Sequence, residues 1–271
     1  MSRVTISLLW IVGSALFIPG GAYKLFQEHL RLDYKHRHHS TYHIKQLRQT
    51  GPLATGYLAE LMGLCVDRPM SIYQFDLDRA RANLLKSPLI KEATIRARPP
   101  QTLTIDYVVR TPLARVYDYE NLALDEEGHL FPFHPFFSQK IPEVYLALPF
   151  NQPLKGRGVD LALTLLKQLS SEELGIVRID VSQAFAESYG QREIVLMVED
   201  ELIHRGVRFV IPRYLRLSPK NYLAELGNYL NLRTQLLEKE KKQLKTTNQD
   251  AVVRLPAMTI DFRIAQLAFI E

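Results

Sequence analysis

The N-terminal segment restricts the fold more than any other feature of the chain. After Arg3, no charged residue occurs from Val4 to Tyr23, a run of 20 positions. A helix needs about 20 mostly apolar residues to cross the ~30 Å hydrocarbon core of a bilayer. The alternatives are a buried soluble helix or a cleaved signal peptide, since Pro19 would end a helix and the small residues after it are typical of a cleavage site. We predict a retained single transmembrane helix over residues 4–23.

The charges beside this helix do not decide its orientation. One cation, Arg3, precedes the run, and four cations follow it, namely Lys24, Arg31, Lys35 and Arg37. The positive-inside rule alone would place the C-terminal side in the cytoplasm. That rule weakens when a long folded domain follows the helix, so charge counting leaves both orientations open.

Beyond the N-terminal segment, the composition is that of a globular chain. The 271 residues correspond to about two domains. Hydrophobic residues at 46% and charged residues at 23% exclude wholesale disorder and a polytopic membrane protein. A net charge of +5 is too small to indicate nucleic-acid binding. The single cysteine, Cys65, excludes an internal disulfide framework and a cysteine-rich metal site.

Five of the eight histidines lie in one short segment after the predicted helix. They are His29, His36, His38, His39 and His43. Imidazoles at this spacing can bind transition metals. No cysteine completes such a site and few acids lie nearby, so we interpret residues 24–40 as a solvated juxtamembrane connector and predict no metal site.

The next 70 residues predict a small two-layer module. Its expected elements are a strand near 43–47, a helix over 56–64 capped by Thr55, a helix from Leu77 capped by Asp76 and ended at Ser87-Pro88, and strands over 93–98 and 102–109. Pro99-Pro100-Gln101 makes the turn between the two last strands. The order strand, helix, helix, strand, strand indicates an α+β module.

The rest of the chain predicts a β-rich domain with one long helix. Expected strands lie at 115–117, 122–124, 130–133, 141–146, 177–181, 193–199, 204–211 and 257–264, with a helix over 160–169 and a long helix that Ser218 caps and Pro219 begins. The segment Asp125-Glu126-Glu127-Gly128 is typical of a solvated turn, and His129 and His134 fall in an aromatic stretch that we expect to pack between strands.

Residues 70–114 resemble the POTRA domain of the FtsQ/DivIB family of bacterial cell-division proteins. The resemblance rests on Ile72 and Asp76 at the start of the second helix, on the turn at 87–93, on the hairpin at 98–105 and on the exit at 110–114. Further on, Ile260-Asp261-Phe262-Arg263 after a long helix is similar to the end of FtsQ. The fold class expected from all this is α+β: one transmembrane helix, a POTRA domain (β-α-α-β-β) at 41–112, and a mixed β-rich domain at 113–271 with a long helix and a terminal edge strand.

The resemblance implies a bitopic, non-enzymatic scaffold of the divisome that recruits and links partners of septal peptidoglycan synthesis. Residues 1–3 would be a cytoplasmic tail, and the domains after the helix would be periplasmic, at the septum of the inner membrane. No cofactor is expected. The alternative is another POTRA-bearing component of protein translocation or secretion. The sequence has no Ser-x-x-Lys, HExxH, GxxxxGK[ST], GxSxG or GxGxxG motif, so we predict no catalytic residues.

In the FtsQ family, the C-terminal edge strand binds small coiled-coil division proteins of the FtsB/DivIC and FtsL type. The resemblance therefore implies a partner-binding strand over Thr259–Ala268, joined through backbone hydrogen bonds. The expected contact residues are Thr259, Asp261, Arg263, Ile264, Ala265, Gln266, Leu267 and Ala268, with Tyr222 and Tyr229 on the preceding helix.

Within that strand, alternation places Met258, Ile260, Phe262 and Ile264 against the helix. Arg263 is the first choice for a charge-assisted contact with an acidic partner segment. Two roles stay open for Asp261, either a partner contact or a structural tie to a neighbouring strand. An edge of the POTRA sheet, near 44–47 or 93–98, is expected to be available to another division protein, such as a septal wall synthase.

Overall fold

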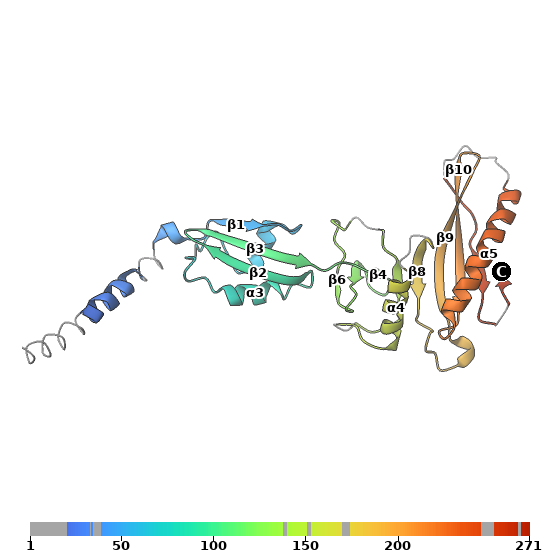
Figure 1. Cartoon of the computed structure of the whole chain (residues 1–271), viewed down its shortest axis with the longest axis horizontal. Helices are drawn as coiled ribbons and strands as arrows, with labels where there is room; N and C mark the ends of the chain where they lie inside the picture. The colour runs from blue at the N-terminus through green and yellow to red at the C-terminus, as the bar shows by residue number, and fades with distance from the viewer. Residues whose placement is uncertain are drawn as a thin grey trace, which may run out of the picture. The chain divides into compact units, whose positions relative to one another are not determined.

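The chain divides between Val109 and Arg110 into two compact units (Figure 1). The computed structural model describes residues 21–32, 34, 39–137, 140–150, 153–169, 174–244, 252–264 and 267–271. The predicted cytoplasmic tail and most of the predicted transmembrane helix, residues 1–20, lie outside this part, as do five residues of the connector. Residues 21–32 are helical. No helix in the described ranges has the length and apolar character to cross a membrane.

The first unit has the predicted order of elements. These are the 3-10 helix η1 (Ser40–Tyr42), β1 (Gln46–Gln49), α2 (Thr55–Leu61), α3 (Leu77–Leu84), β2 (Ile90–Arg98) and β3 (Thr102–Val109). The sheet has the order β1-β3-β2, with β1 parallel and β2 antiparallel to the central strand β3. The β-α-α-β-β arrangement is therefore confirmed, and β1 and β2 are the two edge strands of this sheet.

Local signals explain the two helices of this unit. The Asp76 carboxylate caps α3 as predicted, accepting the backbone N–H of Arg79 at 2.9 Å. The predicted cap of α2 is wrong, because Thr55 is the first helical residue and the N-cap makes no side-chain hydrogen bond. This helix also ends earlier than expected, at Leu61, where the chain turns through Gly63 at a φ of 75°.

The two faces of the first sheet differ in character. Leu103 and Ile105 of β3 are fully buried, and Ala93 and Ile95 of β2 are buried beside them. Both helices contact the sheet, α3 along β2 and α2 at β1. Because side chains alternate along a strand, the polar residues between these apolar ones point to the opposite face. That face carries the threonines of β3 and arginines from both edge strands.

The second unit is built on one large mixed sheet. Its strands are β4 (Ala114–Val116), β5 (Leu122–Leu124), β6 (Leu130–Pro132), β7 (Glu143–Tyr145), β8 (Ile176–Asp180), β9 (Ile194–His204), β10 (Val207–Leu217), β11 (Val252–Arg254), β12 (Met258–Asp261) and β13 (Phe269–Ile270). Their order is β13-β12-β10-β9-β8-β7-β4-β5-β6, and β11 pairs with β10 as well. The helices are α4 (Arg157–Gln168), η2 (Tyr189–Gln191) and α5 (Tyr222–Gln243).

The β9–β10 hairpin is longer than predicted. Its strands pair from Ile194↔Leu217 to His204↔Val207, and the turn uses positive φ at Arg205 and Gly206. The sequence prediction ended the first strand at 199 and began the second at 204. Asp200 is nevertheless buried inside the strand, with Arg213 of β10 bonded to it at 2.7 Å. An acid paired in this way can occupy a strand interior.

The long helix also begins later than predicted. It starts at Tyr222, so Ser218 is not its N-cap and Pro219 is not its first residue. Ser218 instead binds the buried Glu225 carboxylate, with its backbone N–H 2.6 Å from Glu225 Oε2. This bond fixes the turn between β10 and α5.

The C-terminal strand differs most from its prediction. A strand over 257–264 with a free edge over 259–268 was expected, but β12 ends at Asp261 and has neighbours on both sides. It pairs in parallel with β10, and β13 pairs antiparallel with its other side, Ile260 opposite Ile270 and Asp261 opposite Phe269. β13 is therefore the edge strand at this end of the sheet, because the chain turns back on itself after β12, and β6 is the edge strand at the other end.

Candidate partner-binding site

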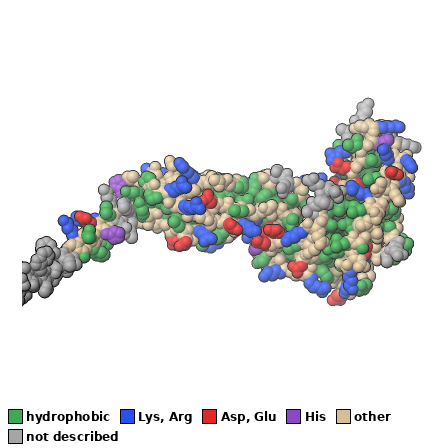
Figure 2. Space-filling view, in the orientation of Figure 1, with side chains coloured by type: hydrophobic (Ala, Val, Ile, Leu, Met, Phe, Trp, Pro, Cys, Tyr) green, Lys and Arg blue, Asp and Glu red, His purple; other side chains and the backbone are tan. Residues whose placement is uncertain are grey.

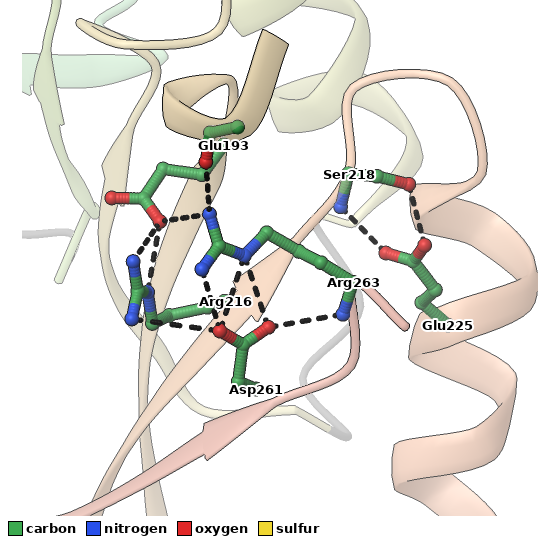
Figure 3. A network of polar contacts seen from close by, with 7 residues as sticks. Glu193, Arg216, Ser218, Glu225, Asp261 and Arg263 are labelled. Carbon is green, nitrogen blue, oxygen red and sulfur yellow. Dashed lines mark hydrogen bonds and ion pairs between the residues drawn. The ribbon is translucent and has the colours of Figure 1, made fainter. Parts of the chain in front are cut away.

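A closed group of charges joins β9, β10 and the end of β12 (Figure 3). Arg216 contacts Glu193 at 2.6 Å, and Arg263 contacts Asp261 at 2.7 Å. Two longer contacts cross between these pairs, Arg263 to Glu193 at 3.1 Å and Arg216 to Asp261 at 3.5 Å. Two cations thus balance two acids, and the group carries no net charge.

This arrangement gives Asp261 and Arg263, both expected to contact a partner, ion-pair partners within the chain. Burial alone would raise the pKa of Asp261, but the hydrogen bonds from Arg263 outweigh it and the pKa is lowered. The hydrogen bond to Asp261 in turn raises the pKa of Arg263. Asp261 thus ties β12 to β10 through Arg216, as the structural alternative expects, and its contact with a partner stays a prediction. Arg263, the first choice for a contact with an acidic partner segment, has carboxylates of its own chain around its guanidinium.

A cavity of about 510 Å³ adjoins this charged group. Asp261 and Arg263 form part of its wall, together with three cations that sequence reasoning did not select: Arg157, Arg192 and Lys220. Asp261 is the only acid in the lining. The cavity surroundings are therefore positive, because the charge of Asp261 is already matched by Arg263.

Aromatic rings hold these three cations. The guanidinium of Arg157 lies 4.4 Å from the ring centroid of Phe185, and that of Arg192 lies 5.1 Å from Tyr189. The ammonium of Lys220 lies 5.6 Å from the same tyrosine ring. None of the three makes an ion pair with a described residue. Arg192 also donates its Nε–H to the Ala186 carbonyl oxygen at 2.7 Å. Because a cation–π contact does not use the hydrogen-bonding groups of a cation, this wall can accept carboxylates.

Apolar side chains are exposed next to the cavity, at the end of the chain. Ile264 lines the cavity and is 53% exposed, and Leu267, Phe269 and Ile270 are exposed to about the same degree. The predicted packing of Ile264 against the helix is thus wrong, since the strand has already ended there. The other predicted inward residues behave as expected, with Ile260 and Phe262 buried and Met258 half-buried.

The remaining predicted contact residues differ in their surroundings. Tyr229 is fully buried and donates its hydroxyl to Asp200 at 2.8 Å, so it is a core residue and not a contact surface. Burial and the Asp200 charge raise its pKa. Tyr222 is half-buried and donates to Gln168 at 2.9 Å. Ala268 is exposed, Thr259 is bonded to the last residue of the chain, and Ala265 and Gln266 lie outside the described residues.

One further cluster has the composition of a metal site. Ligand atoms of Asp125, Glu127 and His129 all lie within 4.8 Å of one another. The Arg110 guanidinium, however, lies 2.6 Å from Asp125 and 3.5 Å from Glu127. The other Asp125 oxygen accepts two backbone N–H groups of the turn. Arg110 therefore occupies the cation position. The prediction of a solvated turn is wrong for Asp125, which is buried as the anchor of that turn.

The cavity residues that sequence reasoning missed come from three separate segments. Arg157 begins α4, Arg192 precedes β9, and Lys220 lies between β10 and α5. No spacing or motif links them, since the fold alone brings them together. The resemblance indicated only the part of the wall that Asp261, Arg263 and Ile264 form.

Comparison with known proteins identifies the first unit. Residues 60–107 match the domain family described as "POTRA domain, FtsQ-type". No curated protein gave a match to the chain. The chain therefore carries an FtsQ-type POTRA domain, the domain of the FtsQ/DivIB family, and the resemblance seen in residues 70–114 is confirmed.

Proposed function

We propose that this chain is a single-pass, non-enzymatic cell-division scaffold that links partners of septal wall synthesis. The observation that carries the proposal is the FtsQ-type POTRA domain, which belongs to a family of membrane-anchored division proteins. In this proposal residues 1–3 are cytoplasmic, residues 4–23 span the inner membrane, and the domains at 41–112 and 113–271 are periplasmic.

The second unit supplies the proposed partner site. A small coiled-coil division protein of the FtsB/DivIC or FtsL type places an acidic segment in the positive cavity and a strand along the sheet edge. The cavity and the exposed apolar end of the chain adjoin each other through Ile264, so one partner segment can use both. Backbone pairing provides affinity, and the cations select an acidic partner.

The proposed strand takes the place that β13 holds on β12. This self-pairing is short: it consists of two register pairs and the two hydrogen bonds between the backbones of Thr259 and Glu271, at 3.0 and 3.1 Å. Phe269 and Ile270 remain about half exposed, so pairing buries little of their apolar surface. A longer partner strand can form more hydrogen bonds and cover β12 more completely.

Localisation tests the overall function. We expect a fluorescent fusion of the full chain to concentrate at the division septum. Removing residues 43–112 while keeping the N-terminal segment should abolish that localisation, because the POTRA domain is proposed to recruit the protein. Microscopy of both fusions at matched expression provides the measurement. Septal localisation of the deleted form, or uniform membrane staining of the intact form, contradicts the proposal.

Truncation tests the strand exchange. Removing residues 267–271 frees the outer side of β12, so the partner should bind about tenfold more tightly, equivalent to ~1.4 kcal/mol. Isothermal titration of the full chain and the truncated chain with the purified partner, both in detergent, measures the change. Phe269→Ala in the full-length chain disturbs β13 less than the truncation does, so a smaller increase in affinity for the partner is expected. A loss of affinity on truncation would show that the partner adds to β13 itself.

A further inference from the structure

The helix of residues 21–32 leaves its apolar side chains uncovered. Every residue in it is exposed. Its large apolar side chains keep between 51% and 70% of their surface open; they are Tyr23, Leu25, Phe26, Leu30 and Leu32. Figure 2 shows hydrophobic side chains beside Lys and Arg on this helix, the first coloured segment after the grey N-terminal residues. In the described chain, no other element buries these apolar side chains.

The charged residues of this helix lie on one narrow stripe. They are Lys24, Glu28 and Arg31, at steps of four and three residues, and Gln27 borders them. Residues three and four apart share one side of a helix, so we call this side the polar stripe. The apolar side chains occupy most of the remaining surface. The helix is therefore amphipathic, with an apolar side that is wider than its polar stripe.

Such a helix needs a source of stability beyond its own hydrogen bonds. Isolated helices shorter than about 12–15 residues are marginal in water, and most helical stability in proteins comes from packing of an amphipathic face. The hydrogen bond from Gln27 Nε2 to the Tyr23 hydroxyl, at 2.8 Å, lies within the helix and does not cover the apolar side. An apolar environment outside the described chain would supply the missing packing.

The position of the helix in the sequence indicates that this environment is lipid. The helix continues directly from the uncharged run 4–23, so it starts where that segment would reach the bilayer surface. Helices usually end before a proline, so Pro19 allows the helix after it to take a direction of its own. A helix that lies along the surface places its apolar side at the acyl chains and its charged side toward water.

The charges and the width of the apolar side agree with a lipid surface. Residues 24–37 contain four cations and two acids, and cations beside an interfacial helix attract anionic headgroups. Tyr23 is of a residue type that is enriched where a membrane meets water. His29 lies on the apolar side, and its ring combines an apolar body with a polar tip. A partner helix would cover only a narrow seam of this side.

We propose that the helix of residues 21–32 lies in the membrane interface, with its apolar side at the acyl chains and its polar stripe toward the headgroups and water. This inference rests on the proposed membrane-spanning segment, residues 4–23. The solvated connector that was expected over residues 24–40 then begins only after residue 32.

The test uses the full chain with Cys65→Ser in nanodiscs of phosphatidylcholine and phosphatidylglycerol, with one introduced cysteine at a time carrying a nitroxide spin label. Power-saturation electron paramagnetic resonance compares collisions with oxygen, which concentrates in lipid, and with a water-soluble nickel chelate. Labels at Phe26→Cys and Leu30→Cys should collide mainly with oxygen. Labels at Gln27→Cys and Glu28→Cys, the matched controls, should collide mainly with the nickel chelate. Equal access of the chelate to all four positions would overturn the proposal.

A label at Ser14→Cys separates this inference from the proposed function. If residue 14 is shielded from the chelate while residues 26 and 30 are exposed to it, only the surface position of the helix is overturned. If residue 14 is exposed too, the membrane anchor fails and this inference fails with it. Labels at 26 and 30 that are shielded from both reagents would show that protein, not lipid, covers the helix. Dipolar broadening between labels would identify that protein as a second copy.

Substitution gives a second readout in the same nanodiscs. Phe26→Gln with Leu30→Gln removes apolar side chains but keeps a residue type that favours helices. Backbone amides of residues 21–32 should then exchange hydrogen about tenfold faster, as measured by mass spectrometry. Glu28→Gln with Arg31→Gln makes as many changes on the polar stripe at constant net charge and should alter exchange less than about threefold. Equal effects of the two double variants would contradict a lipid-covered apolar side.

Discussion

Reversing two charges of the cavity in the second unit should weaken binding of the coiled-coil partner about a hundredfold. The variant is Arg157→Glu with Lys220→Glu. Each change removes an attraction and adds a repulsion toward an acidic segment, and about tenfold per site is typical for charges that are partly desolvated in a complex. Both side chains are exposed and contact aromatic rings, so the fold does not depend on their charge. Titration calorimetry with the purified partner measures the loss.

A matched control separates the cavity from the overall field of the protein. Lys241→Glu with Lys242→Glu makes the same change in net charge at the exposed end of α5. That variant should lower the association rate only slightly and leave the dissociation rate unchanged. Equal losses in the two double variants would show that the cavity has no specific role. If changing an acidic residue of the partner to a basic one restored the affinity, that residue would be identified as the one that contacts the cavity.

The sequence predicted the POTRA domain well because its signals are local. The Asp76 cap, the apolar alternation in β3 and the turn at 99–101 each involve neighbouring residues. These features gave the order of elements and the bounds of β3 directly. The resemblance added the domain type, which the domain comparison confirmed over residues 60–107.

The predictions failed where distant residues change the meaning of a local signal. Asp200 and Asp125 both belong to acidic runs that are typical of exposed turns, yet both are buried because an arginine pairs with each. A short stretch of sequence around the acid does not show such a partner, because the arginine lies elsewhere in the chain. The same holds for β13, a strand of two residues whose existence depends on the free side of β12.

The candidate site was predictable only in part for the same reason. The Asp261–Arg263 pair could be selected from its similarity to the end of FtsQ. The ion pairs that join this pair to Glu193 and Arg216 form only because β9, β10 and β12 lie side by side in the sheet. The cations of the cavity come from three segments, each more than 25 residues from the next along the chain, and only the folded sheet places them on one wall.

Replacing Arg213 should have the largest effect on stability. This side chain is fully buried, and its guanidinium lies 2.7 Å from Asp200 and 2.7 Å from Glu240. Arg213→Ala leaves both acids without this partner and opens a cavity in the core. Asp200 keeps only Arg233 and the Tyr229 hydroxyl. Breaking a buried ion pair in this way costs about 3–5 kcal/mol in the free energy of unfolding.

Two further variants define the cause of that loss. Arg208→Ala removes an ion pair between β10 and Glu201 of β9, but both groups are half exposed, so the cost should stay below about 1 kcal/mol. Arg213→Met with Asp200→Asn fills much of the volume and removes one buried charge, and it should recover part of the stability, because uncompensated charge is the main penalty. Urea unfolding of each full-length variant, followed by tyrosine fluorescence, gives the free energies. Since Arg213 joins β9 to the far end of α5 through these two acids, a loss below 1 kcal/mol would show that apolar packing alone holds the helix on the sheet.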